Sequence, residues 1–161
     1  MRIGVPKEIK VHEYRVGLVP ASVRELTHKG HAVAVETSAG AGVGFADSDY
    51  EAVGAEILPD AAAIFDAAEM VVKVKEPQPS EISLLKPDQV LFTYLHLAAE
   101  PEQTQGLVDT GSVAIAYETV TDDRGGLPLL APMSEVAGRM SIQVGAHCLE
   151  REQGGKGILL G

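Results

Sequence analysis

The chain has 161 residues, of which 45% are hydrophobic and 22% charged, and its formal net charge is −10. This length suits one compact domain, and the acidic balance disfavours nucleic acid and anionic membrane surfaces as partners. The single cysteine, Cys148, excludes an intramolecular disulfide and fits a reducing compartment; we interpret it as a buried helix residue. Without a signal-peptide pattern or an apolar stretch of about 18 residues, the protein is expected to be cytoplasmic.

Strand and helix patterns alternate from the N-terminus. This alternation predicts βαβ units, a mostly parallel sheet and a Rossmann-like (flavodoxin-like) three-layer α/β sandwich. The first strand is predicted over residues 2–5, and a polar, charge-dense loop over 7–18 follows it. Pro20 in the first turn and Gly30 after the last turn bound the first helix. The second strand is expected at 32–36.

A glycine-rich segment, residues 38–45, follows the second strand. Its glycines at 40, 42 and 44 form a G-x-G-x-G pattern and not the G-x-G-x-x-G of a dinucleotide fingerprint, so we interpret the segment as a flexible turn. Asp60 is the expected N-cap of a later helix. The remaining elements are predicted as follows: helices at 47–53, 60–68, 80–85, 101–111 and 133–150, and strands at 55–58, 70–75, 89–96 and 113–118.

Three predicted strands end in an ionisable side chain, namely Lys75, His96 and Glu118. Because ligands of open α/β sheets bind outside the carboxyl ends of the strands, these ends predict one shared site. His96 suits a general acid or base, although it could equally satisfy a backbone group. For Lys75 the plain alternative is a surface pair with Glu76, and for Glu118 a capping or pairing role is favoured over catalysis.

The candidate site is predicted to contain no metal. No two His or Cys residues have the spacing of metal ligands, and neither a Walker pattern nor a G-x-S-x-G elbow is present. Arg15, in the early polar loop, offers a bidentate fork for a carboxylate. A cation and a histidine therefore define the predicted chemistry.

Five motifs occur in order along the chain: residues 1–8 (MRIGVPKE), 13–19 (EYRVGLV), 73–77 (KVKEP), 94–98 (YLHLA) and 132–138 (PMSEVAG). With them the chain resembles the N-terminal half of an alanine dehydrogenase, of the alanine dehydrogenase and NAD(P) transhydrogenase alpha-subunit family. The resemblance runs the whole length of the chain. It implies NAD-dependent, reversible oxidative deamination of L-alanine to pyruvate and ammonia, in a cytoplasmic homo-oligomer that is a hexamer in the family.

The resemblance also implies roles for individual residues. Arg15 would hold the substrate carboxylate, Lys75 would polarise the carbonyl or imine oxygen, and His96 would be the catalytic acid/base. Met133 and Ser134 would lie near the NAD cofactor. Residues 1–131 would form the substrate-binding domain, and residues 132–161 a connecting helix with the start of a dinucleotide-binding domain.

Two other functions stay open. In the family a Rossmann domain with a glycine fingerprint follows, and the sequence reaches Gly161 without one, so the chain alone is expected to be inactive. The related NAD(H)-binding subunit of the proton-translocating transhydrogenase shares the opening motif, but His96 and Lys75 in their motifs favour the dehydrogenase. A non-catalytic module that binds a small carboxylate is the alternative from another class.

Overall fold

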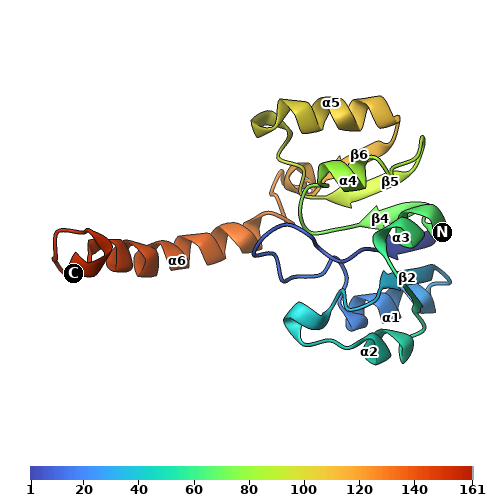
Figure 1. The fold of residues 1–161 in the computed structure, drawn as a ribbon, viewed down its shortest axis with the longest axis horizontal. Helices are drawn as coiled ribbons and strands as arrows, with labels where there is room; N and C mark the ends of the chain where they lie inside the picture. The colour runs from blue at the N-terminus through green and yellow to red at the C-terminus, as the bar shows by residue number, and fades with distance from the viewer. Residues whose placement is uncertain (161) are drawn as a thin grey trace. The chain divides into compact units, whose positions relative to one another are not determined.

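The computed structural model describes residues 1–160, which form two compact units, residues 1–117 and 118–160. The first unit contains a six-stranded sheet in the order β3-β2-β1-β4-β5-β6, and every neighbouring pair of strands is parallel (Figure 1). The strands are β1 (Arg2–Val5), β2 (Ala32–Glu36), β3 (Glu56–Leu58), β4 (Met70–Val72), β5 (Val90–Thr93) and β6 (Val113–Ala116). This order is that of the Rossmann fold, so the predicted fold class is confirmed.

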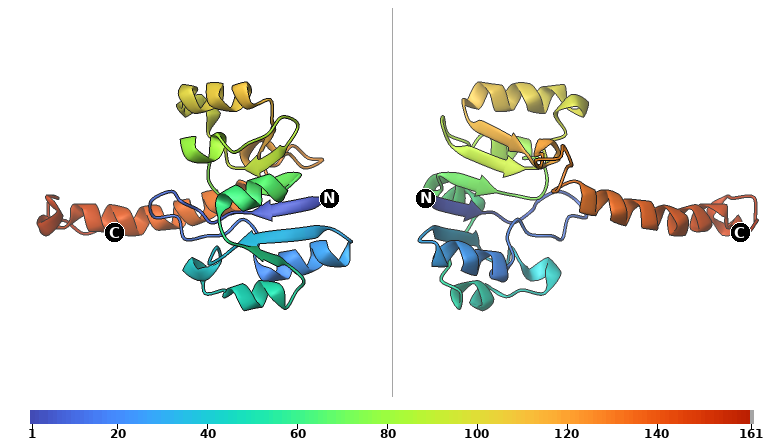
Figure 2. Two further views of the ribbon diagram at one scale, coloured as in Figure 1. Left: turned by 45° about the vertical axis from the view of Figure 1, so that its right-hand side comes forward. Right: turned by 180° about the vertical axis from the view of Figure 1, so that it is seen from behind.

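Helices connect the strands and cover both faces of the sheet (Figures 1 and 2). They are α1 (Pro20–His28), α2 (Asp47–Glu51), α3 (Ala61–Ala67), α4 (Pro79–Ile82) and α5 (Pro101–Thr110). Local signals set several of their ends. Pro20 occupies the first turn of α1, Gly30 has a positive φ of 83° after its end, and the Asp60 carboxylate accepts a hydrogen bond from the Ala63 N–H at 2.8 Å.

Two hydrophobic clusters show how the layers pack. One joins α1 and α2 to the sheet through Val23, Tyr50 and the side chains of Val33 and Val35. The other joins α3 and α5 to the sheet through Phe65, Leu91 and Leu107, among others. Strand residues alternate between faces, so one strand serves both clusters. For example, Val72 of β4 lies in the first cluster and Val71 lies in the second.

Three strands end earlier than predicted. β5 ends at Thr93 instead of His96, which follows as the residue before the 3-10 turn η2 (Leu97–Ala99). β4 ends at Val72 instead of Lys75. Beyond it the Lys73 N–H still donates to the Phe92 carbonyl of β5, whereas the Val74 and Lys75 N–H groups donate to the Glu8 carboxylate and not to a backbone carbonyl. β6 ends at Ala116, and Glu118 lies in the following 3-10 turn η3 (Tyr117–Thr119). Charged side chains therefore follow the strands after a short irregular segment and do not terminate them directly.

The second unit consists mainly of α6 (Ala131–Leu149) and the 3-10 turn η4 (Arg151–Gln153). The prediction of a long helix here is confirmed. Its apolar side chains are exposed within the described residues, Val136 at 58% and Ile142 at 66%. The prediction that Cys148 is buried is wrong, because this helix buries none of its residues in the described chain. No helix in residues 1–160 combines the length and apolarity needed to cross a membrane.

Candidate functional site

The loop that leaves β1 and the segment that leaves β4 lie at the same edge of the sheet. β1 and β4 are adjacent, although two strands and three helices come between them in the chain. From β1 the chain continues to β2 and β3 on one side, and from β4 to β5 and β6 on the other. Ligands of open α/β sheets bind at such a reversal of strand order. The first segment carries Arg15 and the second carries Lys75.

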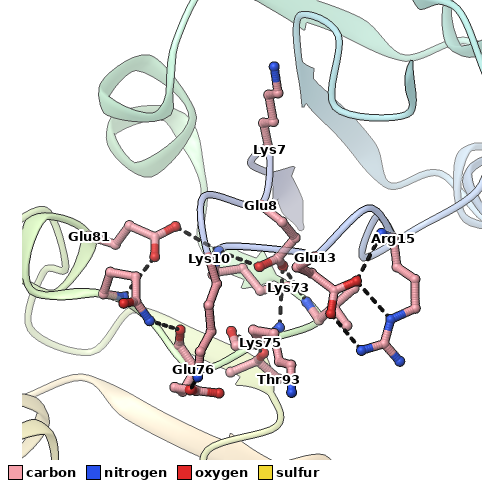
Figure 3. A network of polar contacts seen from close by, with 12 residues as sticks. Lys7, Glu8, Lys10, Glu13, Arg15, Lys73, Lys75, Glu76, Glu81 and Thr93 are labelled. Atoms are coloured by element: carbon pink, nitrogen blue, oxygen red, sulfur yellow. Dashed lines mark hydrogen bonds and ion pairs between the residues drawn. The ribbon is translucent and has the colours of Figure 1, made fainter. Parts of the chain in front are cut away.

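The backbone of Lys75 is held by two neighbouring segments. Its N–H donates to Glu8 Oε1 at 3.4 Å, a long contact that accompanies the 2.6 Å bond from the Val74 N–H to the same oxygen. Its carbonyl accepts a hydrogen bond from Thr93 Oγ1 at 2.8 Å. Both backbone polar groups of Lys75 are therefore engaged, which fixes where its side chain begins (Figure 3).

The Lys75 ammonium makes no ion pair with any residue of the described chain. The alternative pairing with Glu76 is wrong, because the buried Glu76 pairs with Lys10 from the β1 loop. Lys75 is half-buried, and its positive charge acts on the nearby Glu13 carboxyl. A partly desolvated cation with a fixed backbone is suited to stabilise negative charge on a ligand oxygen.

A buried ion cluster lies beneath Lys75. The Lys73 side chain is 0% exposed, and its Nζ donates to Glu81 Oε1 at 2.6 Å and to Glu8 Oε2 at 3.3 Å. Glu81 also accepts from the Gln78 N–H at the start of α4, at 2.8 Å. The cluster thus joins the β1 loop, the end of β4 and the start of α4 (Figure 3). A buried lysine requires such partners, because an unpaired charge in the interior is costly.

Arg15 is paired with Glu13 of the same loop. Arg15 Nε donates to Glu13 Oε1 at 2.8 Å and Nη2 donates to Oε2 at 2.6 Å. The hydrogen bond from Arg15 holds the pKa of the Glu13 carboxyl below its usual range, and the same bond raises the pKa of Arg15. The guanidinium side chain is 45% exposed. Arg15 is therefore an oriented cation that solvent can still reach.

The glycine-rich segment packs against this loop. It contains the 3-10 turn η1 (Ala41–Val43), and a Cβ on Gly42 would lie 2.7 Å from the Tyr14 carbonyl oxygen. A Cβ on Gly40 would lie 2.8 Å from the Tyr50 ring. These glycines therefore permit close packing of protein on protein, which differs from the approach of backbone to pyrophosphate in a dinucleotide loop. A cavity of about 220 Å³ lies between this segment and the loop that carries Arg15.

His96 follows β5 at the same edge of the sheet. Its backbone is left-handed, with φ 50° and ψ 36°, a conformation that is uncommon outside glycine and that clusters at functional sites. Its ring stacks on Tyr94 with centroids 6.2 Å apart, and Tyr94 contacts Tyr117 edge-on at 5.0 Å. Burial raises the pKa of Tyr117, which therefore stays neutral. His96 is exposed at the rim of this aromatic group.

The remaining predicted residues lie in the second unit. Glu118 is in η3, and Met133 and Ser134 are in the first turn of α6. Ser134 Oγ donates to the Leu130 carbonyl of its own helix at 3.4 Å. Their roles toward a cofactor stay predictions. Within residues 1–160, His, Cys, Asp and Glu form no group of three or more that could hold a metal ion.

Sequence reasoning missed the carboxylates that organise the site, namely Glu8, Glu13 and Glu81. The available signal was Lys73, a lysine inside an apolar strand pattern, which demands a buried partner. The sequence does not show which carboxylate pairs with Lys73, since Glu8 is 65 residues away in the chain.

Fold and site together define an α/β domain of Rossmann topology whose strand-order reversal carries two cations suited to an anionic oxygen ligand. Residues 4–137 match the model of the alanine dehydrogenase/PNT N-terminal domain. The chain belongs to this family.

Its relatives include alanine dehydrogenases from Halomonas elongata and Bacillus subtilis, each 60% identical over 160 residues, or 99% of this chain. The chain spans 43% and 42% of their lengths. A solved structure of an L-alanine dehydrogenase aligns with all of this chain, at 59% sequence identity and a TM-score of 0.89. The aligned part is 44% of the length of that dehydrogenase. A transhydrogenase structure from Sinorhizobium meliloti is more distant, with 28% sequence identity and a TM-score of 0.71. The alignment covers 77% of this chain and 37% of the transhydrogenase chain.

Proposed function

We propose that this chain supplies the substrate-binding half of an NAD-dependent alanine dehydrogenase, which converts L-alanine reversibly to pyruvate and ammonia. The observation that carries the proposal is Lys75, whose backbone is bonded on both sides while its ammonium lacks an ion pair among the described residues. The sequence identity to the alanine dehydrogenase of Halomonas elongata, 60%, is about twice the 28% identity to the transhydrogenase. This supports the dehydrogenase over the transhydrogenase subunit.

The proposed roles follow from the chemistry of each side chain. Arg15 binds the substrate carboxylate through its guanidinium fork. Lys75 donates to the carbonyl oxygen of pyruvate, or to the corresponding oxygen during imine hydrolysis, and so favours the form with more negative charge on that oxygen. His96 is exposed and follows β5, the strand next to β4 in the sheet. It moves protons on water and the carbinolamine.

The described residues do not fit the pyrophosphate of a dinucleotide. In the glycine-rich segment 38–45, Gly40 and Gly42 pack on tyrosines, and in the loop 154–157 Gly155 and Gly157 lie against the Leu149 carbonyl and the Arg151 side chain, which leaves no backbone cradle for phosphate. We therefore assign to this chain substrate binding and proton transfer only. NAD would be held by the part of the family's architecture that the chain does not span, with Met133 and Ser134 near it. Homo-oligomeric assembly and a cytoplasmic location belong to the same proposal and rest on family membership.

A pyruvate titration tests the substrate site. The imidazole signals of the five histidines are followed by NMR, with a His96→Asn spectrum to assign His96. Saturable shifts at His96 are expected in the wild type and should vanish in Lys75→Ala. Lys86→Ala is the matched control, because Lys86 pairs with Asp66 away from the site. Equal shifts in Lys75→Ala and the wild type would contradict the role of Lys75.

Turnover is tested separately. The chain alone is expected to bind pyruvate without forming NADH from alanine and NAD. Alanine-dependent NADH formation by the purified chain would contradict the division of labour proposed for it.

A further inference from the structure

The Glu13 carboxylate forms a bidentate ion pair with one edge of the Arg15 guanidinium. In addition to the two side-chain bonds, Glu13 Oε1 accepts from the Arg15 backbone N–H at 2.9 Å. The Glu13 side chain is only 6% exposed, whereas that of Arg15 is 45% exposed. A two-bond contact of this kind fixes the plane of the guanidinium as well as its position.

The backbone on either side of Arg15 packs closely against other segments of the chain. A Cβ on Gly42 would lie 2.7 Å from the Tyr14 carbonyl oxygen, and a Cβ on Gly17 would lie 2.5 Å from the Val72 carbonyl oxygen at the end of β4. The chain before and after Arg15 therefore packs against two different segments. The two side-chain bonds to Glu13 then restrict the rotation of the long Arg15 side chain.

An arginine held in one orientation recognises a planar carboxylate better than a mobile one, because the cost of ordering the side chain is met before the ligand arrives. The same orientation brings little benefit to an uncharged ligand, which draws little attraction from the guanidinium. Glu13 is also ionised at neutral pH, since the bond from Arg15 holds its pKa below the usual range.

We infer that Glu13 is a positioning residue, which fixes the guanidinium plane of Arg15 and thereby makes the site selective for a carboxylate over its uncharged analogue. The inference rests on the proposed role of Arg15 as the group that binds the substrate carboxylate. Glu13 acts through Arg15 and is not assigned any contact with substrate.

The test compares pyruvate with pyruvamide, which replaces the carboxylate by an amide. Dissociation constants for both are measured by calorimetry on the wild type, Glu13→Gln, Arg15→Lys and the double variant. In Glu13→Gln an NH₂ group faces the Arg15 donors, so pyruvate should bind about tenfold more weakly, equal to about 1.4 kcal/mol. Pyruvamide binding should stay unchanged. In the Arg15→Lys background, Glu13→Gln should have no further effect.

Two further variants complete the design. Asp66→Asn makes the same charge change in an exposed ion pair and should leave both ligands unaffected. Glu13→Asp keeps the charge but is one methylene too short to hold both guanidinium nitrogens, so it should show an intermediate loss for pyruvate. It also serves as the measured variant if Glu13→Gln does not fold.

Each contrary result has a distinct meaning. Pyruvate binding that is unchanged or tighter in Glu13→Gln would overturn the inference, since Glu13 would then be a bystander or a competitor for Arg15. Equal weakening of pyruvate and pyruvamide would also overturn it, because Glu13 would then act on the loop as a whole. If Arg15→Lys leaves pyruvate binding unchanged, the proposed role of Arg15 fails first and the inference falls with it.

Discussion

Lys73→Met removes the charge at the centre of the buried cluster and keeps an unbranched side chain of similar length. In the folded protein it would leave Glu8 and Glu81, whose side chains are 2% and 3% exposed, without their shared cation. Removing one partner of a buried ion pair costs about 3–5 kcal/mol of the free energy of unfolding. For a chain of this size the melting temperature should fall by roughly 6–20 °C, at about 2–4 °C for each kcal/mol.

The assay is urea unfolding followed by far-ultraviolet circular dichroism, which separates a change in midpoint from a change in slope. Lys86→Met is the control, because it removes a lysine from an exposed pair whose side chains are 48% and 83% exposed. Such exposed pairs contribute little. Lys73→Met/Glu81→Gln should recover part of the lost stability, since it removes one of the two stranded carboxylates. A Lys73→Met midpoint as close to the wild type as that of Lys86→Met would refute the reasoning.

Two other predictions concern the loop that carries Arg15. Gly42→Ala should lower the free energy of unfolding by about 1–3 kcal/mol, because its Cβ would clash with the Tyr14 carbonyl, and it should weaken pyruvate binding. Gly138→Ala has open space around its Cβ in a helix interior and should raise the free energy of unfolding by roughly 0.5–1 kcal/mol. Equal effects in the two denaturation curves would contradict the packing account. Because the pKa of Glu13 is lowered in the folded protein, its ionised carboxylate stabilises the fold at every pH above the usual value of 4.5. This contribution is lost as the pH falls through the lower folded-state pKa. In Glu13→Gln the free energy of unfolding should therefore fall less steeply at acid pH, in unfolding curves measured from pH 7 to pH 2. An acid limb as steep in Glu13→Gln as in the wild type would contradict this assignment.

Local patterns predicted most of the elements because the signals that set them lie within a few residues. Pro20 and Gly30 bound α1, Asp60 caps α3, and the alternation of strands with helices identified the parallel sheet. The prediction failed at the end of β4, where a distant side chain competes with the regular backbone pattern. β4 stops three residues early, and the Val74 and Lys75 N–H groups beyond it donate to the Glu8 carboxylate and not to a neighbouring strand.

The candidate residues were predicted in part by pattern and in part by resemblance. Lys75 and His96 stood out as charges after apolar strands, while Arg15 in a polar loop acquired a role only from the family motifs. The structure brings the loops of Arg15 and Lys75 together because β1 and β4 are neighbours. It also shows that Lys73 and Lys75, two residues apart, differ sharply, since one is buried between two carboxylates and the other lacks an ion pair in the described chain.

The sequence by itself determined the α/β class, the order of the elements and the family motifs, since these depend on short-range periodicity and on residue identity. Only the tertiary structure decided which carboxylate meets which cation. Glu8 binds Lys73 across 65 residues, Glu13 pairs with Arg15, and Glu76 pairs with Lys10 and not with its neighbour Lys75. The physical reason is that ion pairing in an interior depends on burial and distance, and both are set by the strand order and the packing of loops at the sheet edge, which no local pattern encodes.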